Sequence, residues 1–146
     1  MLVIFPIHPR TRKNLASFRL RKRLGELPGL QLIEPLGYLD FLKLMTSARL
    51  VLTDSGGIQE ETTILNIPCL TLRENTERPI TVEIGSNQIA GTDPDRIIRA
   101  YRQATNGERR KSQIPPLWDG YAAERIVKIL VMAKVSKKVS GSLSTN

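Results

Sequence analysis

Short apolar runs alternate with amphipathic segments along this chain at a regular spacing. The apolar runs cover residues 2–7, 30–33, 50–52, 69–72 and 88–90. Between them, apolar side chains recur at roughly helical spacing, as Leu15, Phe18, Leu20 and Leu24 do. This alternation is typical of parallel strands joined by helices that cover both faces of a sheet. It predicts one three-layer α/β domain with a mainly parallel sheet of about five strands.

The expected domain occupies residues 1–133. Its helices are predicted over residues 15–24, 38–45, 58–65, 79–84, 94–101 and 122–133. The chain has 146 residues, of which 40% are hydrophobic, and this is enough for one ordinary core but not for two. Residues 134–146 are rich in Ser and Lys and have too little to bury, so a disordered tail is expected there.

The third apolar run leads directly into two glycines, Gly56 and Gly57, and then into a helical pattern. Ser55 can cap such a helix with its hydroxyl group. Glycines leave the backbone N–H groups at a helix N-terminus open to an anion. Glu60 and Glu61 follow, placed to accept hydroxyl groups from whatever carries that anion, or else to favour the helix dipole only. The segment predicts a site for a phosphorylated sugar or a nucleotide.

A dense polar loop follows the fourth run at residues 73–79. Open α/β sheets bind their ligands at the carboxyl ends of strands, which is where this loop is expected. Its charged residues Arg73, Glu74, Glu77 and Arg78 also fit an exposed loop held by ion pairs. Both interpretations remain open from the residues alone.

The chain carries 22 Lys and Arg against 14 Asp and Glu, a net charge of +8. Such an excess suits nucleic acid, an anionic membrane or a phosphorylated ligand. Seven of the basic residues lie near the start: Arg10, Arg12, Lys13, Arg19, Arg21, Lys22 and Arg23. Only Phe18 is interleaved with them and no nucleic-acid module is present, so they predict a solvated helix face and no nucleic-acid partner.

Targeting and metal signals are absent from the sequence. No stretch of about 18 apolar residues exists, and the apolar start lacks the basic residues of a secretion signal, so no membrane span is expected. Cys69 is the single cysteine, which favours a reducing cytoplasm, and it is expected in a buried strand. No His or Cys stands at metal-ligand spacing from it.

Two long motifs carry a specific resemblance. They are Thr53-Asp54-Ser55-Gly56-Gly57-Ile58-Gln59-Glu60-Glu61 and, beyond Pro68, Leu72-Arg73-Glu74-Asn75-Thr76-Glu77-Arg78-Pro79. Together they resemble the C-terminal domain of the non-hydrolysing UDP-N-acetylglucosamine 2-epimerases. The likeness runs from Phe5-Pro6-Ile7-His8-Pro9 to Trp118-Asp119-Gly120. It implies a Rossmann-like domain, one of the two that form a GT-B fold with the UDP-sugar in the cleft between them.

The resemblance also implies roles for seven substrate-binding residues. Ser55, Gly56 and Gly57 would hold the diphosphate, and Glu61 would accept the ribose hydroxyl groups. His8 would lie beside the phosphates, Phe41 near the uracil, and Arg78 at the diphosphate and sugar end. From sequence alone, His8 also fits a strand terminus, and Phe41 fits the core because its helical neighbours are apolar.

The reaction implied is conversion of UDP-GlcNAc to UDP-ManNAc by anti elimination of UDP and its re-addition, with no cofactor or metal. In similar enzymes the acid/base carboxylates lie on the N-terminal domain. We therefore expect no catalytic residue in this chain, which resembles a C-terminal fragment without its domain's first strand and is inactive alone. A separate chain with the N-terminal domain and a second copy of this chain are the expected partners. A glycosyltransferase donor domain and a noncatalytic remnant are the alternatives.

Overall fold

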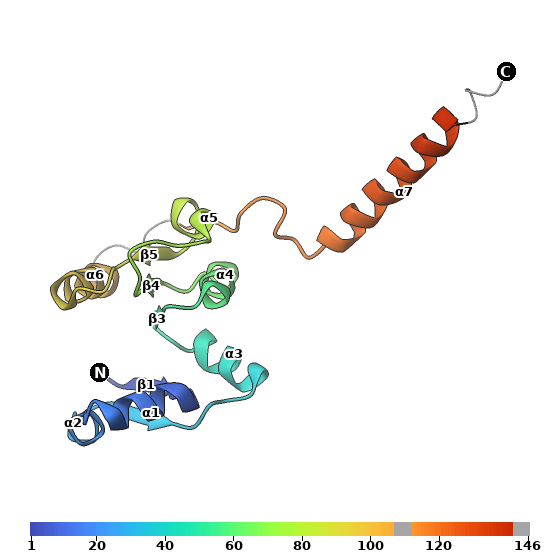
Figure 1. Ribbon diagram of the computed structural model, residues 1–146. Coiled ribbons are helices and arrows are strands. Elements are labelled where there is room, and N and C mark those ends of the chain that lie inside the picture. The colour runs from blue at the N-terminus through green and yellow to red at the C-terminus, as the bar shows by residue number, and fades with distance from the viewer. Residues whose placement is uncertain (107–111, 142–146) are drawn as a thin grey trace. The chain divides into compact units, whose positions relative to one another are not determined.

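The chain forms two compact units, Met1–Ser47 and Ala48–Asn146. A computed structural model describes residues 1–106 and 112–141 (Figure 1). Every pair of neighbouring strands in it is parallel, and helices connect the strands in sequence. The α/β class predicted from the sequence is therefore confirmed.

The first unit contains two strands and three helices. In chain order they are β1 (Val3–Pro6), α1 (Pro9–Ser17), α2 (Arg21–Gly25), β2 (Leu30–Ile33) and α3 (Tyr38–Thr46). The single helix predicted over residues 15–24 is wrong, because Arg19 adopts a left-handed φ of 54° that separates α1 from α2. The basic residues of α1 lie on a helix without buried residues, as expected for a solvated face.

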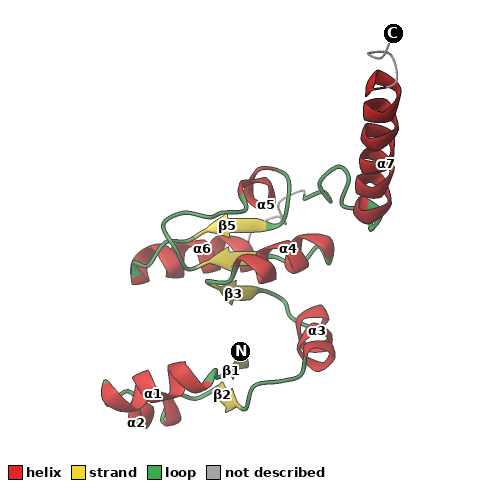
Figure 2. Cartoon of the chain, turned by 45° about the vertical axis from the view of Figure 1, so that its right-hand side comes forward, coloured by secondary structure: helices red, strands yellow, loops and turns green. Residues whose placement is uncertain are grey.

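The second unit is built around a three-stranded sheet in the order β3-β4-β5. Its elements are β3 (Val51–Thr53), α4 (Gly56–Ile64), β4 (Cys69–Thr71), α5 (Pro79–Glu83), β5 (Asn87–Ile89), α6 (Pro94–Asn106) and α7 (Ala122–Gly141). Helices α4 and α6 lie on opposite sides of this sheet (Figures 1 and 2). The helix starting at the two glycines is therefore packed directly against the central strand.

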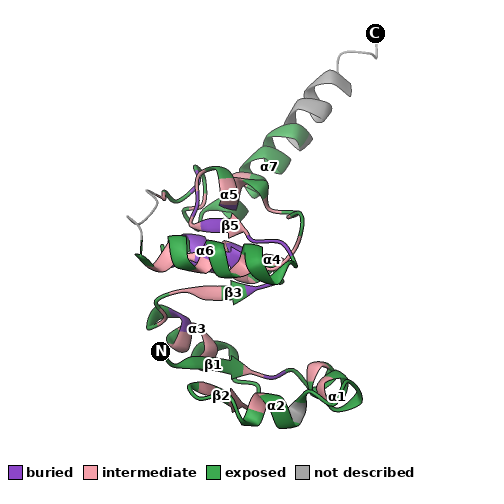
Figure 3. Ribbon diagram, turned by 90° about the vertical axis from the view of Figure 1, so that its left-hand side faces the viewer, coloured by how far each residue is buried: buried purple, intermediate pink, exposed green. Residues whose placement is uncertain are grey.

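The two faces of this sheet differ in chemistry. On the side of α6, Leu70, Ala90 and Ala100 form an apolar core. On the side of α4, the buried residues are mostly polar: Gln59, Thr62, Thr63, Thr71, Thr81 and Asn87 (Figure 3). Cys69 faces this polar layer, and burial raises the pKa of its thiol to about 11. The helix that carries the candidate site therefore rests on hydrogen bonds as well as on apolar contact.

Three residues of types that favour helix boundaries have that role. Asn66 follows α4 with a left-handed φ of 53°. Pro79 occupies the first turn of α5. Asp93 precedes α6, and its Oδ1 accepts a hydrogen bond from the N–H of Arg96 at 2.8 Å.

The strand pairing differs from the prediction of one sheet. The five expected strands are present, but they form a sheet of β1 and β2 and a separate sheet of β3, β4 and β5. Hydrophobic periodicity reveals strands but not which strands share hydrogen bonds, so it could not reveal this division. Helix α7 extends to Gly141, into the segment expected to be a disordered tail, whereas residues 142–146 lie outside the described range.

Candidate functional site

Helix α4 begins at Gly56, with Ser55 in the extended N-cap conformation. The predicted capping by the Ser55 hydroxyl is wrong, because that side chain makes no capping hydrogen bond. Instead, the Ser55 N–H donates to Oγ1 of the buried Thr53 at 3.0 Å, which fixes the turn from β3 into the helix. The first N–H groups of an α-helix have no partner within the helix, so this terminus can donate to an anion.

The fold itself has no need of glycine at this turn. A Cβ on Gly56 would meet Arg78 Cγ at 3.9 Å, and a Cβ on Gly57 would meet Ser55 Oγ at 4.0 Å, both ordinary contacts. At Gly85, in contrast, a Cβ would lie 2.6 Å from Thr63 Oγ1 and from the Thr81 carbonyl oxygen. Packing therefore explains Gly85 but neither Gly56 nor Gly57. At a helix N-terminus, glycine leaves the backbone open to the close approach of a ligand.

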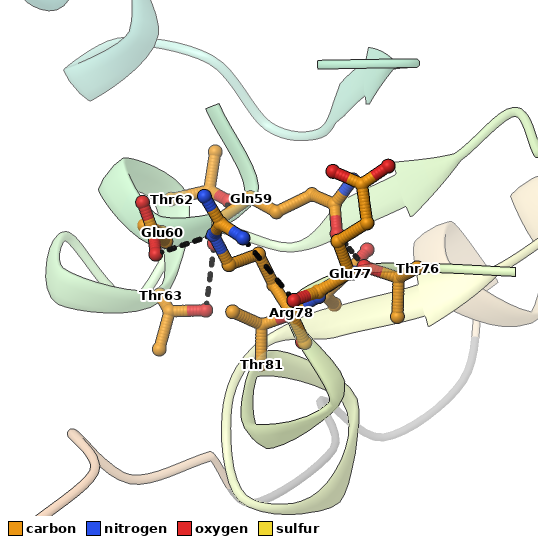
Figure 4. A network of polar contacts seen from close by, with 9 residues as sticks. Gln59, Glu60, Thr62, Thr63, Thr76, Glu77, Arg78 and Thr81 are labelled. Atoms are coloured by element: carbon orange, nitrogen blue, oxygen red, sulfur yellow. Dashed lines mark hydrogen bonds and ion pairs between the residues drawn. The ribbon is translucent and has the colours of Figure 1, made fainter. Parts of the chain in front are cut away.

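The Arg78 side chain lies beside this terminus (Figure 4). Its Nε is 2.7 Å from Oε1 of Glu60, one turn into α4, and one terminal N–H donates to the Glu77 carbonyl at 3.2 Å. The Arg78 and Glu60 side chains are 42% and 40% exposed, so the guanidinium remains reachable from solvent. A permanent cation is thereby held next to the positive end of a helix, where it adds to the attraction for an anion.

The backbone of Arg78 is fixed on both of its polar groups (Figure 4). Its N–H donates to Thr76 Oγ1 at 2.9 Å, and its carbonyl accepts from Thr81 Oγ1 at 2.7 Å. Thr76 Oγ1 in turn donates to Gln59 Oε1 at 2.5 Å. The loop between β4 and α5 is thus latched to α4 through Gln59.

Asn87 extends this latch into the sheet. Its Nδ2 donates to Gln59 Oε1 and to Thr81 Oγ1, both at 3.1 Å, and its Oδ1 accepts from Thr71 Oγ1 at 2.7 Å. All four residues are fully buried. No local pattern in the sequence predicts this network. The one signal for it is the presence of polar residues at positions where a two-sided parallel sheet calls for apolar ones.

Glu60 and Glu61 have different surroundings. Neither lies in the first turn of α4, so the interpretation of both as first-turn acids that favour the helix dipole is wrong. Glu60 forms the ion pair with Arg78. Among the described residues, no ion pair or side-chain hydrogen bond engages the half-buried Glu61 carboxylate. It remains available as an acceptor.

The other charged residues of the loop form exposed ion pairs. Arg73 contacts Glu77 at 3.2 Å, and Glu74 contacts Arg96 at 2.8 Å. Hydrogen bonds from the Thr92 backbone and from Arg96 lower the pKa of the Glu74 carboxyl. These residues fit the ion-pair interpretation and hold the shape of the loop that carries Arg78.

The seven predicted site residues are divided between the two units. Ser55, Gly56, Gly57 and Arg78 lie together in the second unit, with Glu61 further along α4. His8 and Phe41 belong to the first unit. His8 is the N-cap of α1, where its Nδ1 accepts from the N–H of Arg10 at 3.3 Å. Phe41 is half-buried in α3.

Metal chemistry has no support in the part of the chain that the structure describes, since no three His, Cys, Asp or Glu residues are grouped there as ligands. Nor does any described helix have the length and apolar content of a membrane span.

Comparison with known families decides the relationship of this chain. The model of the UDP-N-acetylglucosamine 2-epimerase family matches residues 1–131. The chain belongs to this family. It is 48% identical over 132 residues to the UDP-N-acetylglucosamine 2-epimerase of Methanocaldococcus jannaschii. The matched residues are 90% of this chain and 36% of the relative. The Escherichia coli K12 enzyme is 36% identical over 140 residues, with 92% of this chain and 36% of the relative covered.

Solved structures agree with this relationship. The crystal structure of the M. jannaschii enzyme in complex with UDP-GlcNAc and UDP has a TM-score of 0.79 and 47% identity, over 90% of this chain and 36% of that one. The Neisseria meningitidis enzyme bound to UDP-GlcNAc has a TM-score of 0.75 and 32% identity over the same shares. The epimerase-family chain thus spans about a third of the length of its relatives and matches their C-terminal part.

Proposed function

We propose that this chain is the UDP-binding part of a UDP-N-acetylglucosamine 2-epimerase. The observation that carries the proposal is the convergence of the Arg78 guanidinium and the glycine-lined start of α4, two sources of positive charge at one accessible spot. The diphosphate of UDP-GlcNAc is the matching ligand. Relatives with UDP or UDP-GlcNAc in their structures support the same choice.

The chemistry assigned to this site is stabilisation of a leaving group. In an epimerisation that eliminates UDP and adds it back, negative charge grows on the diphosphate as the bond from the anomeric carbon breaks. Backbone N–H groups of α4 and the Arg78 guanidinium, already oriented by the fold, would stabilise that charge without further reorganisation. The acid/base groups that move the C2 proton would come from the part of the relatives that this chain does not match.

Three further contacts complete the proposed binding mode. The Glu61 carboxylate, which has no ion-pair partner among the described residues, accepts hydrogen bonds from the ribose hydroxyl groups. His8 contributes a contact to the phosphates, and Phe41 lies near the uracil. We further propose that the chain acts in the cytoplasm and is inactive without the missing part, whether as a fragment or beside a separate chain.

A thermal-shift experiment tests the binding proposal. UDP should raise the melting temperature of the chain, whereas AMP should not, because a ligand that binds only the folded state stabilises it by about 2.7 kcal/mol at a hundred times its dissociation constant. Ser55→Trp, which places an indole over the helix terminus, should abolish the shift. A folded chain whose melting temperature does not change with UDP would contradict the proposal.

The role of Glu61 has a test of its own. UDP offers two ribose hydroxyl groups and 2′-deoxy-UDP one, so the wild-type chain should bind UDP about tenfold more tightly, the value of one hydrogen bond to a charged acceptor. Glu61→Ala should lose this preference. Glu60→Ala, the neighbouring control, should keep it, and equal discrimination in all three proteins would contradict the assignment.

A further inference from the structure

The Arg78 side chain lies along one face of α4. Gly56 and Glu60 are four residues apart, so they are neighbours on the surface of this helix. A Cβ on Gly56 would be 3.9 Å from Arg78 Cγ, and Arg78 Nε is 2.7 Å from Glu60 Oε1 (Figure 4). Side chains of a helix lean toward its N-terminus. The Glu60 carboxylate therefore meets the guanidinium on the side of the glycine-lined helix start.

This ion pair differs from the others in the arginine nitrogen that it uses. In the part of the chain that the structure describes, four other ion pairs join an arginine to a carboxylate, and each is made through a terminal nitrogen of the guanidinium. Glu60 contacts the inner nitrogen, Nε. Of the terminal nitrogens of Arg78, Nη1 donates to the Glu77 carbonyl, and Nη2 has no hydrogen-bond partner among the described residues. The outer edge of this guanidinium therefore keeps donors for a ligand.

The contact restrains the guanidinium through charge. Glu60 Oε1 is close to Nε, but no acceptor among the described residues is in line with the Nε N–H, so the two charges attract each other without a directed hydrogen bond. A long, partly exposed arginine side chain otherwise samples many rotamers. Ordering such a side chain at the moment of binding weakens the affinity for the ligand. A carboxylate that restrains Arg78 beforehand reduces this cost.

We propose that Glu60 is a positioning residue of the diphosphate site. It restrains Arg78 at Nε and leaves the terminal N–H groups for phosphate oxygens, with which a guanidinium forms charge-assisted hydrogen bonds. The inference rests on the proposed function, because it assigns Glu60 a role within that site. The two adjacent glutamates of α4 then serve different parts of one ligand. Glu61 binds the ribose directly, and Glu60 acts on the diphosphate through Arg78.

Competition with the ligand is the alternative role for the Glu60 carboxylate. A negative charge beside a diphosphate repels it, and a carboxylate that only neutralised Arg78 would lower the affinity of the site for UDP. Removal of the Glu60 charge would then strengthen UDP binding. The positioning role predicts weaker binding instead, so the sign of the change distinguishes the two roles.

Calorimetric titration with UDP measures this sign. Glu60→Gln keeps the size of the side chain but removes its charge, and we expect it to weaken UDP binding about tenfold, the value of one charge-assisted hydrogen bond. The melting temperature without ligand should stay the same, because an exposed ion pair contributes little to stability. Glu60→Asp retains the charge and should bind UDP more tightly than Glu60→Gln does. Tighter binding by Glu60→Gln than by the wild-type chain overturns the proposal.

Two further variants show whether the effect passes through the guanidinium. Arg78→Met retains an apolar stem without the charge, so in this background Glu60→Gln should no longer weaken UDP binding. A loss of the same size with and without the guanidinium overturns the proposal. Glu83→Gln is the matched control, because it removes the same charge from an exposed residue of α5 that has no ion pair in the described ranges. It should leave the affinity for UDP unchanged.

A measurement without ligand separates this inference from the proposed function. The ¹⁵N relaxation of Arg78 Nε, assigned with the Arg78→Lys variant, reports the motion of this side chain. We expect restricted motion in the wild-type chain and in Glu83→Gln, and larger motion on the nanosecond scale in Glu60→Gln. Motion restricted by Glu60 in a chain that does not bind UDP would reject the proposed function alone. Equal motion of Arg78 Nε in the wild-type chain and Glu60→Gln, or equal affinity of the two for UDP, would reject this inference alone.

Discussion

At the scale of single residues, the two glycines of α4 are not required for folding, so a role in binding can be tested separately. Neither Gly56 nor Gly57 has a left-handed φ, and a Cβ fits at both positions. Glycine within a helix costs up to about 1 kcal/mol relative to alanine. The chain thus carries two residues that weaken its helix and are not required by its packing, which is the expected pattern where a ligand must reach the backbone.

Gly57→Ala should therefore leave the fold intact and impair the site. We expect the free energy of unfolding without ligand to be unchanged or raised by about 0.5 kcal/mol, because alanine favours the helical conformation. Affinity for UDP should fall about tenfold or more, since the new methyl group lies where the phosphate approaches the N–H groups. Chemical denaturation and calorimetric titration measure the two effects. Unchanged affinity for UDP in the variant would mean that Gly57 is required neither for packing nor for UDP binding.

Gly85→Ala provides the opposite case. Its Cβ would contact the Thr63 side chain and the Thr81 backbone at 2.6 Å, a distance that real Cβ atoms essentially never show. We expect a destabilisation of about 1–3 kcal/mol from overpacking. The dissociation constant of UDP, measured well below the melting temperature, should change little. The two glycine variants together distinguish loss of fold from loss of ligand.

At the scale of elements, the network through Gln59 determines where Arg78 lies. The loop after β4 contacts α4 through Thr76 and Gln59, and Asn87 of β5 donates a hydrogen bond to Gln59. Buried polar networks of this kind are costly when one member is removed, because its partners then lose hydrogen bonds without access to water. The latch therefore couples the integrity of the sheet to the position of the cation.

Thr76→Val is the variant that opens this latch. It keeps the shape of the side chain but removes the acceptor for the Arg78 N–H and the donor to Gln59, so we expect a loss of about 1–3 kcal/mol in unfolding free energy and weaker UDP binding. Thr76→Ser retains the hydroxyl and should preserve UDP affinity. If valine and serine variants bind UDP equally, the latch does not position Arg78.

Sequence reasoning could predict the elements and the turn but not the support beneath them. Local signals reveal strands, helix boundaries such as Asn66 and Asp93, and the glycine turn, because each depends on residues close in sequence. The Gln59 network joins residues up to 28 positions apart, and no local pattern specifies such pairs. For the same reason, side-chain polarity does not predict the buried face of α4, where Ile64 is 42% exposed and Gln59 is fully buried.

At the scale of the whole molecule, the two units differ in the core that each can form. Of the described apolar residues that are buried, the first unit contributes Ile7 and Met45, and the second contributes Ile67, Cys69, Leu70, Ala90 and Ala100. A unit of 47 residues with a two-stranded sheet is marginal by itself. The first unit should therefore open more readily than the second.

Limited proteolysis should reveal this difference and test the roles proposed for His8 and Phe41. Without ligand, trypsin should cut first at Arg10, Arg12 or Lys13 and only later at Arg73 or Arg96, because cleavage follows the population of locally opened states. If His8 and Phe41 contact bound UDP, the ligand stabilises the first unit as well, and the early cuts should slow in proportion to UDP occupancy.

His8→Asn retains a side chain that can cap α1 but lacks the imidazole, so it should reduce this protection while the early cutting without ligand stays the same. Mass spectrometry of the fragments measures both rates. Early cuts that UDP leaves unchanged, in a chain whose melting temperature UDP raises, would confine the nucleotide contacts to the second unit.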